Sequence, residues 1–139
     1  MLKYSLLHPE VLRGLGEAGH GAQILIADGN YPLLTRTNPG ARKVYLNFAA
    51  DMLSVTDVLK VLTTAIPIEA ALTMRADGGE EPPIVAGFRA LLPGITLQSL
   101  DPSSFYEAAR GPDLALAIAT GERRTYANIL ITIGVVQPD

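Results

Sequence analysis

The sequence contains no cysteine among its 139 residues. This absence excludes a disulfide framework, a cysteine nucleophile and a zinc site built on cysteine. Only two histidines are present, His8 and His20, and two separated histidines make a poor metal site. The sequence therefore predicts a protein without a metal cofactor.

The sequence also lacks any run of lysine or arginine, and its formal net charge is −3. Binding to nucleic acid or anionic lipid needs a basic surface, so neither partner is expected. The first residues, "MLKYSLLHPEVL", place a proline and a glutamate directly after a few apolar residues. This pattern fits neither a signal peptide nor a membrane span, and we expect a cytoplasmic protein that does not bind membranes.

Hydrophobic residues make up 48% of the chain and charged residues 18%. This composition is typical of a globular protein, and the length of 139 residues matches one domain that covers 1–139. The apolar fraction is also high enough to suggest that surface is buried against other subunits. The sequence thus predicts a single domain that forms a homo-oligomer.

Helical and extended patterns alternate along the chain. The expected helices lie at 9–19, 54–65, 84–92 and 101–110. The expected strands lie at 23–27, 43–48, 66–74 and 94–100, with two more around a polar turn within 113–136. This alternation predicts an α/β fold with a mixed β-sheet flanked by helices on both faces.

The first group of candidate functional residues surrounds the strand at 23–27. Asp28 follows this strand, and α/β sheets bind ligands beyond the carboxyl ends of their strands. His20 lies eight residues earlier, between Gly19 and Gly21, and we expect it just across the strand, where it could transfer protons. The alternatives are a turn aspartate at 28 and a histidine that interacts with the last carbonyls of a helix.

A second group lies in "TGERRTYANI", residues 120–129. A tight turn between two strands does not need this many polar side chains. Tyr126 can donate a hydroxyl proton, and Asn128 offers both a donor and an acceptor, which suits sugar hydroxyls. The alternative is a solvated turn at Arg123 and Arg124 with Tyr126 as an edge aromatic.

Several catalytic motifs are missing, namely GxGxxG, GxxxxGK[ST], HExxH and GxSxG. Nucleotide binding, metalloprotease chemistry and α/β-hydrolase chemistry are therefore not expected. The remaining acid, base and hydrogen-bonding groups fit proton transfer on an uncharged polar substrate.

Three separated motifs resemble the ribose pyranase and fucose mutarotase family of sugar mutarotases. They are "GHG" followed by a strand, "AD" and "YP"; the segment "SSFYEAA"; and "TGERRTYANILITIGV" near the C-terminus. The resemblance implies a cytoplasmic isomerase without cofactor that interconverts the ring forms of a free monosaccharide such as L-fucose. It also implies a homodecamer of two stacked pentameric rings with sites at the subunit contacts.

The resemblance carries over the roles of His20, Asp28, Tyr126 and Asn128, and Tyr106 and Arg124 are further candidates for substrate binding. His20, Asp28 and Tyr126 are expected to be catalytic, whereas the expected substrate-binding residues are Tyr106, Arg124 and Asn128. Opening a hemiacetal needs a base for the anomeric hydroxyl and an acid for the ring oxygen. We expect His20 and Tyr126 to carry these protons, with Asp28 orienting the imidazole or binding a hydroxyl of the sugar.

The motifs "FYEAA" and "TGER" are more similar to the fucose branch of the family than to the ribose branch. Pro102 is a departure, because ribose members tend to carry histidine and fucose members arginine at this position. The missing sugar-binding group is either lost or supplied by Arg110, Arg123 or Arg124. A ribose pyranase, or a non-catalytic sugar-binding or regulatory member, is the alternative function.

Overall fold

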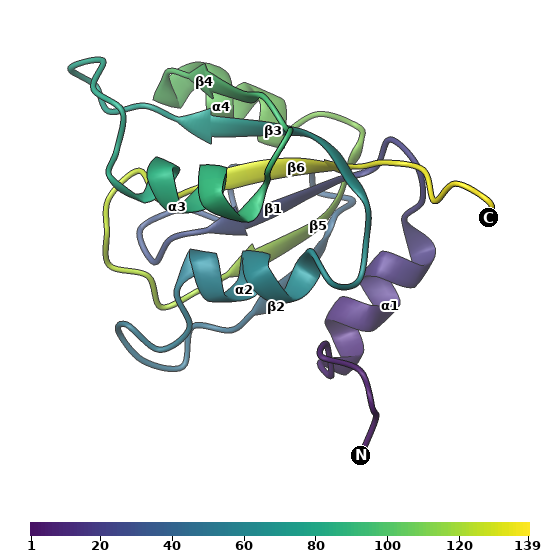
Figure 1. Cartoon of the computed structure of the whole chain (residues 1–139). Helices are drawn as coiled ribbons and strands as arrows, with labels where there is room; N and C mark the ends of the chain where they lie inside the picture. Colours follow the sequence, from purple (N-terminus) through teal and green to yellow (C-terminus); the bar gives the residue numbers. More distant parts are fainter.

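The computed structural model of the protein describes residues 1–139 and contains four helices and six strands. The helices are α1 (Pro9–Glu17), α2 (Val55–Leu62), α3 (Ile84–Leu91) and α4 (Pro102–Ala109). The strands are β1 (Gln23–Ala27), β2 (Arg42–Tyr45), β3 (Ile68–Met74), β4 (Leu97–Leu100), β5 (Leu114–Ala119) and β6 (Ile129–Ile133). All six strands form one sheet in the order β2-β5-β1-β6-β3-β4 (Figure 1).

The sheet is mixed, as the sequence predicted. β1 and β2 run parallel to β5, β3 runs parallel to β4, and β6 is antiparallel to both β1 and β3. Only β6 therefore runs against the other strands. The carboxyl ends of β1, β3 and β5 meet the amino end of β6 at one edge of the sheet.

The connection between β5 and β6 differs from the expected turn. Although these strands follow one another in the sequence, they do not pair, because β1 lies between them. The segment 120–128 must therefore cross the carboxyl end of β1. This crossing places its polar side chains beside Asp28.

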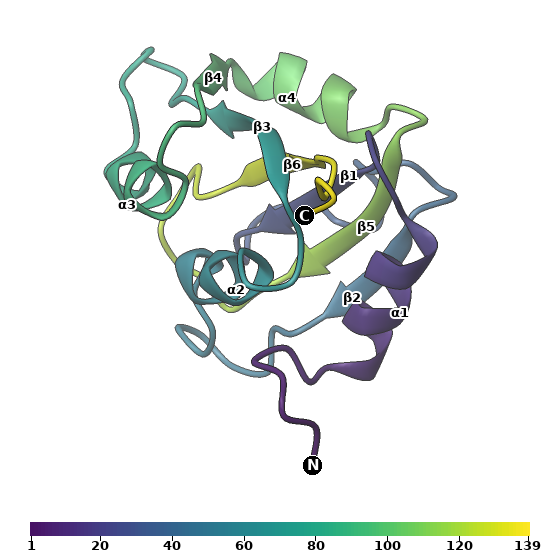
Figure 2. The ribbon, with the colours of Figure 1, turned by 45° about the vertical axis from the view of Figure 1, so that its right-hand side comes forward.

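Helices cover both faces of the sheet, as predicted from the sequence (Figure 2). Successive side chains of a strand point to opposite faces. Ile24 and Ile26 accordingly pack with residues of α1, α2 and α3, whereas Leu25 and Ala27 pack with residues of α4. Because β1 is covered on both sides, it is a continuous apolar run rather than an alternating one.

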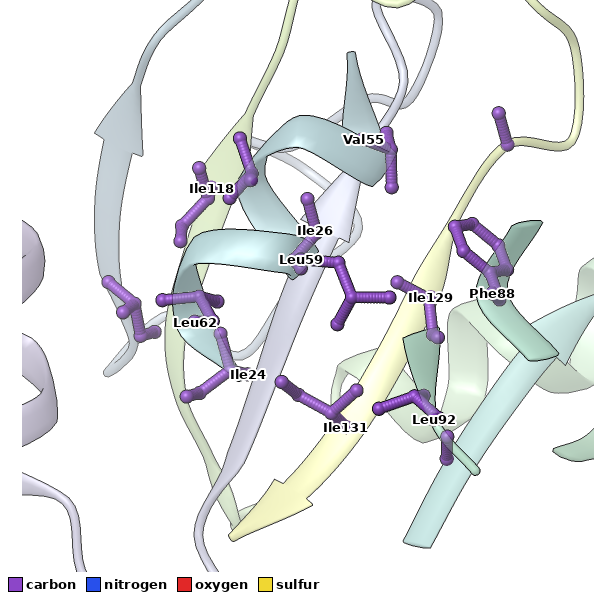
Figure 3. Packing of buried hydrophobic residues seen from close by; sticks show 14 of the residues in the cluster. Ile24, Ile26, Val55, Leu59, Leu62, Phe88, Leu92, Ile118, Ile129 and Ile131 are labelled. Carbon is purple, nitrogen blue, oxygen red and sulfur yellow. The ribbon is translucent and has the colours of Figure 1, made fainter. Parts of the chain in front are cut away.

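The larger core lies between the sheet and the pair α2 and α3. Figure 3 shows the side chains of these helices, including Leu59 and Phe88, packed over those of β1 and β6. Both side chains are fully buried. This layer holds β1 and β6 in place from the face opposite α4.

Two helix starts follow directly from the sequence. The Ser54 hydroxyl accepts from the N–H of Asp57, whose carboxylate accepts from the N–H of Ser54 in return. Asp101 accepts from the N–H of Ser104 at 2.8 Å, and Pro102 occupies the first turn, where no N–H is needed.

Most elements are shorter than the sequence suggests. α2 ends at Leu62 because the N–H groups of Thr64 and Ala65 bond to carbonyls three residues earlier rather than four. β3 begins at Ile68, because Pro67 has no N–H for the sheet. β2 ends at Tyr45 rather than at residue 48, and β4 begins at Leu97 rather than at residue 94. The longest helix, α1, has nine residues, and no helix is long and apolar enough to span a membrane.

Replacement of Leu59 by alanine tests the packing of α2 on the sheet. Leu59 is 0% exposed, so Leu59→Ala should lower the free energy of unfolding by about 2–5 kcal/mol. Val136 is 78% exposed, and Val136→Ala should change it by about 0.5 kcal/mol or less. Urea denaturation measures both values, and equal effects of the two substitutions would contradict this packing.

Candidate functional site

A polar hollow of about 410 Å³ opens at the edge where β1 and β3 end and β6 begins. This volume lies within the usual range of small-molecule sites. Its lining residues come from four parts of the chain: Asp28, Asn30, Tyr31, Met74, Asp77, Pro102, Tyr106, Thr125, Tyr126 and Asn128. The hollow therefore exists only after the sheet and α4 have assembled.

The Asp28 carboxylate is the centre of the hydrogen bonding around this hollow. Its Oδ1 accepts from the backbone N–H groups of Asn30 and Tyr31, both at 2.9 Å. Its Oδ2 accepts from the N–H of Ala127 at 3.1 Å and from Nδ2 of Asn128 at 3.2 Å. Asp28 thus caps its own turn, as the alternative interpretation held, and also binds the segment that crosses β1.

Asn128 holds Asp28 from a second direction. Its side-chain oxygen accepts from the backbone N–H of Asp28 at 2.8 Å, while its amide donates to the carboxylate. Asn128 is also buried. Its contacts in this structure position Asp28, and its expected binding of substrate stays a prediction.

Burial raises the pKa of Asp28 above its ordinary value, whereas the N–H groups that the carboxylate accepts from act in the opposite direction. A carboxylate with a raised pKa is a better general base and, once protonated, is available as an acid nearer neutral pH. The site therefore holds an acid–base group even without histidine.

Tyr126 has an uncommon backbone conformation at the edge of the hollow. Its φ is 57°, in the left-handed region that costs a non-glycine residue free energy. Such strain persists only where surrounding contacts impose it, and it is frequent at functional sites. Here the next N–H, that of Ala127, is held by Asp28, and the Tyr126 hydroxyl donates to Oδ2 of Asp77 at 3.1 Å.

Asp77 is a site residue that the sequence analysis did not identify. It lies in the loop after β3 and lines the hollow, but it belongs to no recognisable sequence motif. Its only signal is its spatial contact with Tyr126, which is 49 residues away in the sequence. The structure also places Tyr106 in the wall of the hollow, as expected, with its ring 5.3 Å from that of Tyr31.

The crossing segment is anchored to β1 by its own backbone. The Thr120 N–H and hydroxyl both donate to the carbonyl of Ala27, and the Gly29 N–H donates to the carbonyl of Glu122. A side chain at Gly121 would collide with the carbonyl oxygen of Ala49. These contacts explain the "TGE" part of the motif as structural.

Arg124 does not line the hollow. Its Nε and Nη2 each lie 2.8 Å from a carboxylate oxygen of Glu122, a buried residue that also accepts from the N–H of Val55. The guanidinium lowers the pKa of Glu122 below its ordinary value. Within one chain Arg124 therefore compensates a buried charge at the start of α2, and its expected role in sugar binding finds no geometric support here.

The other arginines proposed to replace a group at Pro102 are also engaged elsewhere. Arg123 pairs with Asp51 at 2.8 Å, and Arg110 lies 3.7 Å from Glu107. Neither arginine lines the hollow.

His20 lies at the opposite edge of the sheet from Asp28. Its Nε2 is 3.1 Å from a carboxylate oxygen of Glu69, and its side chain is 58% exposed. The five residues of β1 separate the two side chains by about 16 Å. The expected meeting of His20 and Asp28 across the strand is therefore wrong within one chain. The imidazole also bonds to Glu69 instead of the last carbonyls of α1.

No group of three or more histidine, cysteine, aspartate or glutamate side chains lies close enough to hold a metal ion. Four of the six residues expected from the sequence, Asp28, Tyr106, Tyr126 and Asn128, meet at one hollow. The arrangement offers carboxylates, a phenol and amides at the end of an α/β sheet.

Fold and hollow together define an α/β protein with a polar hollow of small-molecule size at the carboxyl ends of its parallel strands. The chain belongs to the RbsD / FucU transport protein family, whose model matches residues 1–136. This family contains sugar mutarotases and pyranases. The family membership expected from the sequence motifs is confirmed.

Relatives with two different names match over nearly the whole chain. The chain is 30% identical to the D-ribose pyranase of Paracidovorax citrulli, over 97% of this chain and 98% of that protein. It is 28% identical to the fucose mutarotase of Mus musculus, over 94% of this chain and 91% of that protein. The fucose mutarotase of Streptococcus pneumoniae, solved in complex with L-fucose, matches with a TM-score of 0.83 and 25% identity, over 99% of this chain and 100% of that one. These similarities do not separate the ribose branch from the fucose branch.

The pH dependence of stability tests the environment of Asp28. Because the folded-state pKa is raised, the folded protein binds more protons than the unfolded chain between the two pKa values, so this group stabilises less as the pH rises. Asp28→Asn places an NH₂ group against N–H donors and should lower the free energy of unfolding by about 1–3 kcal/mol near pH 4. The difference in the free energy of unfolding between wild type and this variant, measured by urea denaturation, should narrow toward pH 7.

Asp57→Asn is the matched control for that experiment. Hydrogen bonds from Ser54 lower the pKa of Asp57, so its contribution to stability is lost as the pH falls and its gap should widen toward pH 7. If the gap for Asp28→Asn also widened with pH, burial would not dominate at Asp28.

Proposed function

We propose that this protein is a cofactor-independent sugar mutarotase that interconverts the anomers of a free monosaccharide, and its pyranose and furanose forms, by ring opening and closure. The observation that carries this proposal is the meeting of the Asp28 carboxylate and the Tyr126 hydroxyl at one hollow, in a chain of this family. L-Fucose and D-ribose are the first candidate substrates, because relatives named for both sugars match at similar identity.

The reaction requires only two proton transfers. A base removes the proton of the anomeric hydroxyl, the bond between the anomeric carbon and the ring oxygen breaks, and an acid protonates that oxygen as the aldehyde forms. Rotation of the aldehyde and reclosure by the reverse steps give the other anomer. Within one chain, Tyr126 supplies the acid, and Asp28 or Asp77 supplies the base.

His20 enters the proposal through a neighbouring subunit. Its imidazole lies at the opposite edge of the sheet from its own hollow, so it can act on a sugar only in another copy of the chain. We therefore include in the proposal a homodecamer of two pentameric rings, with each hollow completed by His20 of a neighbour. Exposed apolar side chains favour assembly, among them Leu34, Tyr45 and Phe48.

Exchange NMR on L-fucose and D-ribose tests the activity. The wild type should accelerate anomer exchange, and Tyr126→Phe, which removes only the hydroxyl, should slow it by about a hundredfold or more. Tyr4→Phe is the control, because Tyr4 is exposed near the N-terminus and should leave exchange unchanged. Binding of either sugar without accelerated exchange would instead favour the non-catalytic alternative.

Mixed oligomers test the role of His20. His20→Ala alone should slow exchange by about a hundredfold, as should Tyr126→Phe alone. If His20 acts on the hollow of a neighbour in a ring, co-refolding equal amounts of the two variants should restore about a quarter of the wild-type rate, since random neighbours complete that share of the sites.

Light scattering provides the second measurement on the same samples. A large oligomer whose mixture stays inactive would show that both side chains act in the hollow of the same chain, whereas full activity of His20→Ala alone would show that His20 is not needed. A wild type that is monomeric and fully active would contradict a site completed by His20 of a neighbouring subunit.

A further inference from the structure

A second hollow of about 550 Å³ adjoins the first and shares Asp77, Pro102 and Tyr106 with it. The additional lining residues include Arg36, Arg75 and Asp101. We refer to this second hollow as the outer hollow. The three shared residues line both hollows, so the outer hollow is the space next to the hollow beside Asp28.

The backbone of Arg36 is fixed beside the outer hollow. Its N–H donates to the carbonyl of Pro32 and its carbonyl accepts from the Tyr31 hydroxyl, both at 2.9 Å. Tyr31 is buried and packs edge-on against Phe105 of α4, with ring centroids 6.2 Å apart. The backbone position of Arg36 is therefore fixed by contacts with the core, although Arg36 lies in a loop.

The Arg36 side chain extends over one wall of the site. Its Cζ lies 5.8 Å from the centroid of the Tyr106 ring, a distance at which the cation is attracted to the ring face. Every other arginine of the chain forms an ion pair, with partners that are Glu17, Glu10, Asp101, Glu81, Glu107, Asp51 and Glu122. Only the Arg36 guanidinium has no carboxylate within ion-pair distance, and its donors can reach a ligand.

The charges around the outer hollow indicate an uncharged ligand. Arg75 and Asp101 lie 3.8 Å apart and compensate each other. Arg36 and Asp77 remain, so a guanidinium without an ion pair and a carboxylate that accepts only from the Tyr126 hydroxyl line the same space. Hydroxyl groups can satisfy both, whereas an anionic substituent would approach the carboxylates of Asp77 and Asp28.

We propose that Arg36 is a substrate-binding residue that donates to hydroxyl oxygens at the outer end of the sugar, at a site where the carboxylates of Asp77 and Asp28 favour uncharged monosaccharides over acidic ones. This proposal rests on the sugar mutarotase function proposed above. Pro102, in the shared wall, has no side-chain donor, and Arg36 supplies one from the other side of Tyr106.

Substitution of Arg36 tests this role through the separation of KM from kcat. Arg36→Ala should raise the KM of exchange for L-fucose or D-ribose about tenfold or more and leave kcat nearly unchanged, because the contact is made equally in the ground and transition states. Arg36→Lys should recover part of the loss, since an ammonium group keeps the charge without the planar fork. Arg89→Ala is the control, because Arg89 is an exposed residue of α3 that pairs with Glu81 and lines neither hollow.

Sugar selectivity provides an independent readout. D-Galactose carries a CH₂OH group at the carbon where D-galacturonate carries a carboxylate. Titrations of each sugar, monitored by saturation-transfer NMR, compare their binding. The uncharged sugar should bind more tightly to the wild type. Tighter binding of the uronate, or an unchanged KM in Arg36→Ala, would overturn the proposal for Arg36. Accelerated exchange by the wild type would still support the mutarotase function.

A wild type that binds sugars without exchanging them would contradict the mutarotase function alone. The role of Arg36 is then decided by the same variants through Kd, with a tenfold increase in Arg36→Ala as the supporting result and no increase as the contradicting one. A wild type that binds no monosaccharide would overturn both proposals.

Discussion

The Asp28 carboxylate accepts hydrogen bonds from N–H groups in two parts of the chain that are about 100 residues apart in the sequence. One part is the turn that follows β1, and the other is the segment that leads into β6. Because the carboxylate is buried, loss of this contact would leave several N–H groups without partners. The same contact holds the residue after Tyr126 and so maintains the left-handed backbone that directs the phenol toward Asp77.

This contact depends on the strand order. β1 lies between β5 and β6, and only β6 runs against the other strands, so the chain must pass over the carboxyl end of β1 on its way from β5 to β6. The end of β3 reaches the same edge and brings the loop that carries Asp77. α4 closes the hollow with Tyr106. An α/β sheet with a single antiparallel strand thus gathers carboxylate, phenol and amide groups from distant segments.

The arginines divide into structural and available groups. Arg124 neutralises buried Glu122 beside the first turn of α2, and Arg123 pairs with Asp51, so the basic part of the "TGERR" motif stabilises the loops around the crossing segment. Arg36 has no such partner and lies beside the outer hollow. Among the eight arginines, the only one without an ion pair is therefore Arg36, which lines a hollow that a ligand can enter.

Local patterns in the sequence determined the α/β class, the apolar strand that ends at Asp28, and the capped helix starts at Ser54 and Asp101, because a few neighbouring residues decide each of them. The tertiary structure alone decided which side chains share a hollow. It joined Asp77 to Tyr126, directed Arg124 to Glu122, and placed His20 at the far edge of the sheet. Strand order and direction set these distances, and both are fixed by packing between segments 50 to 100 residues apart, which no short stretch of sequence encodes.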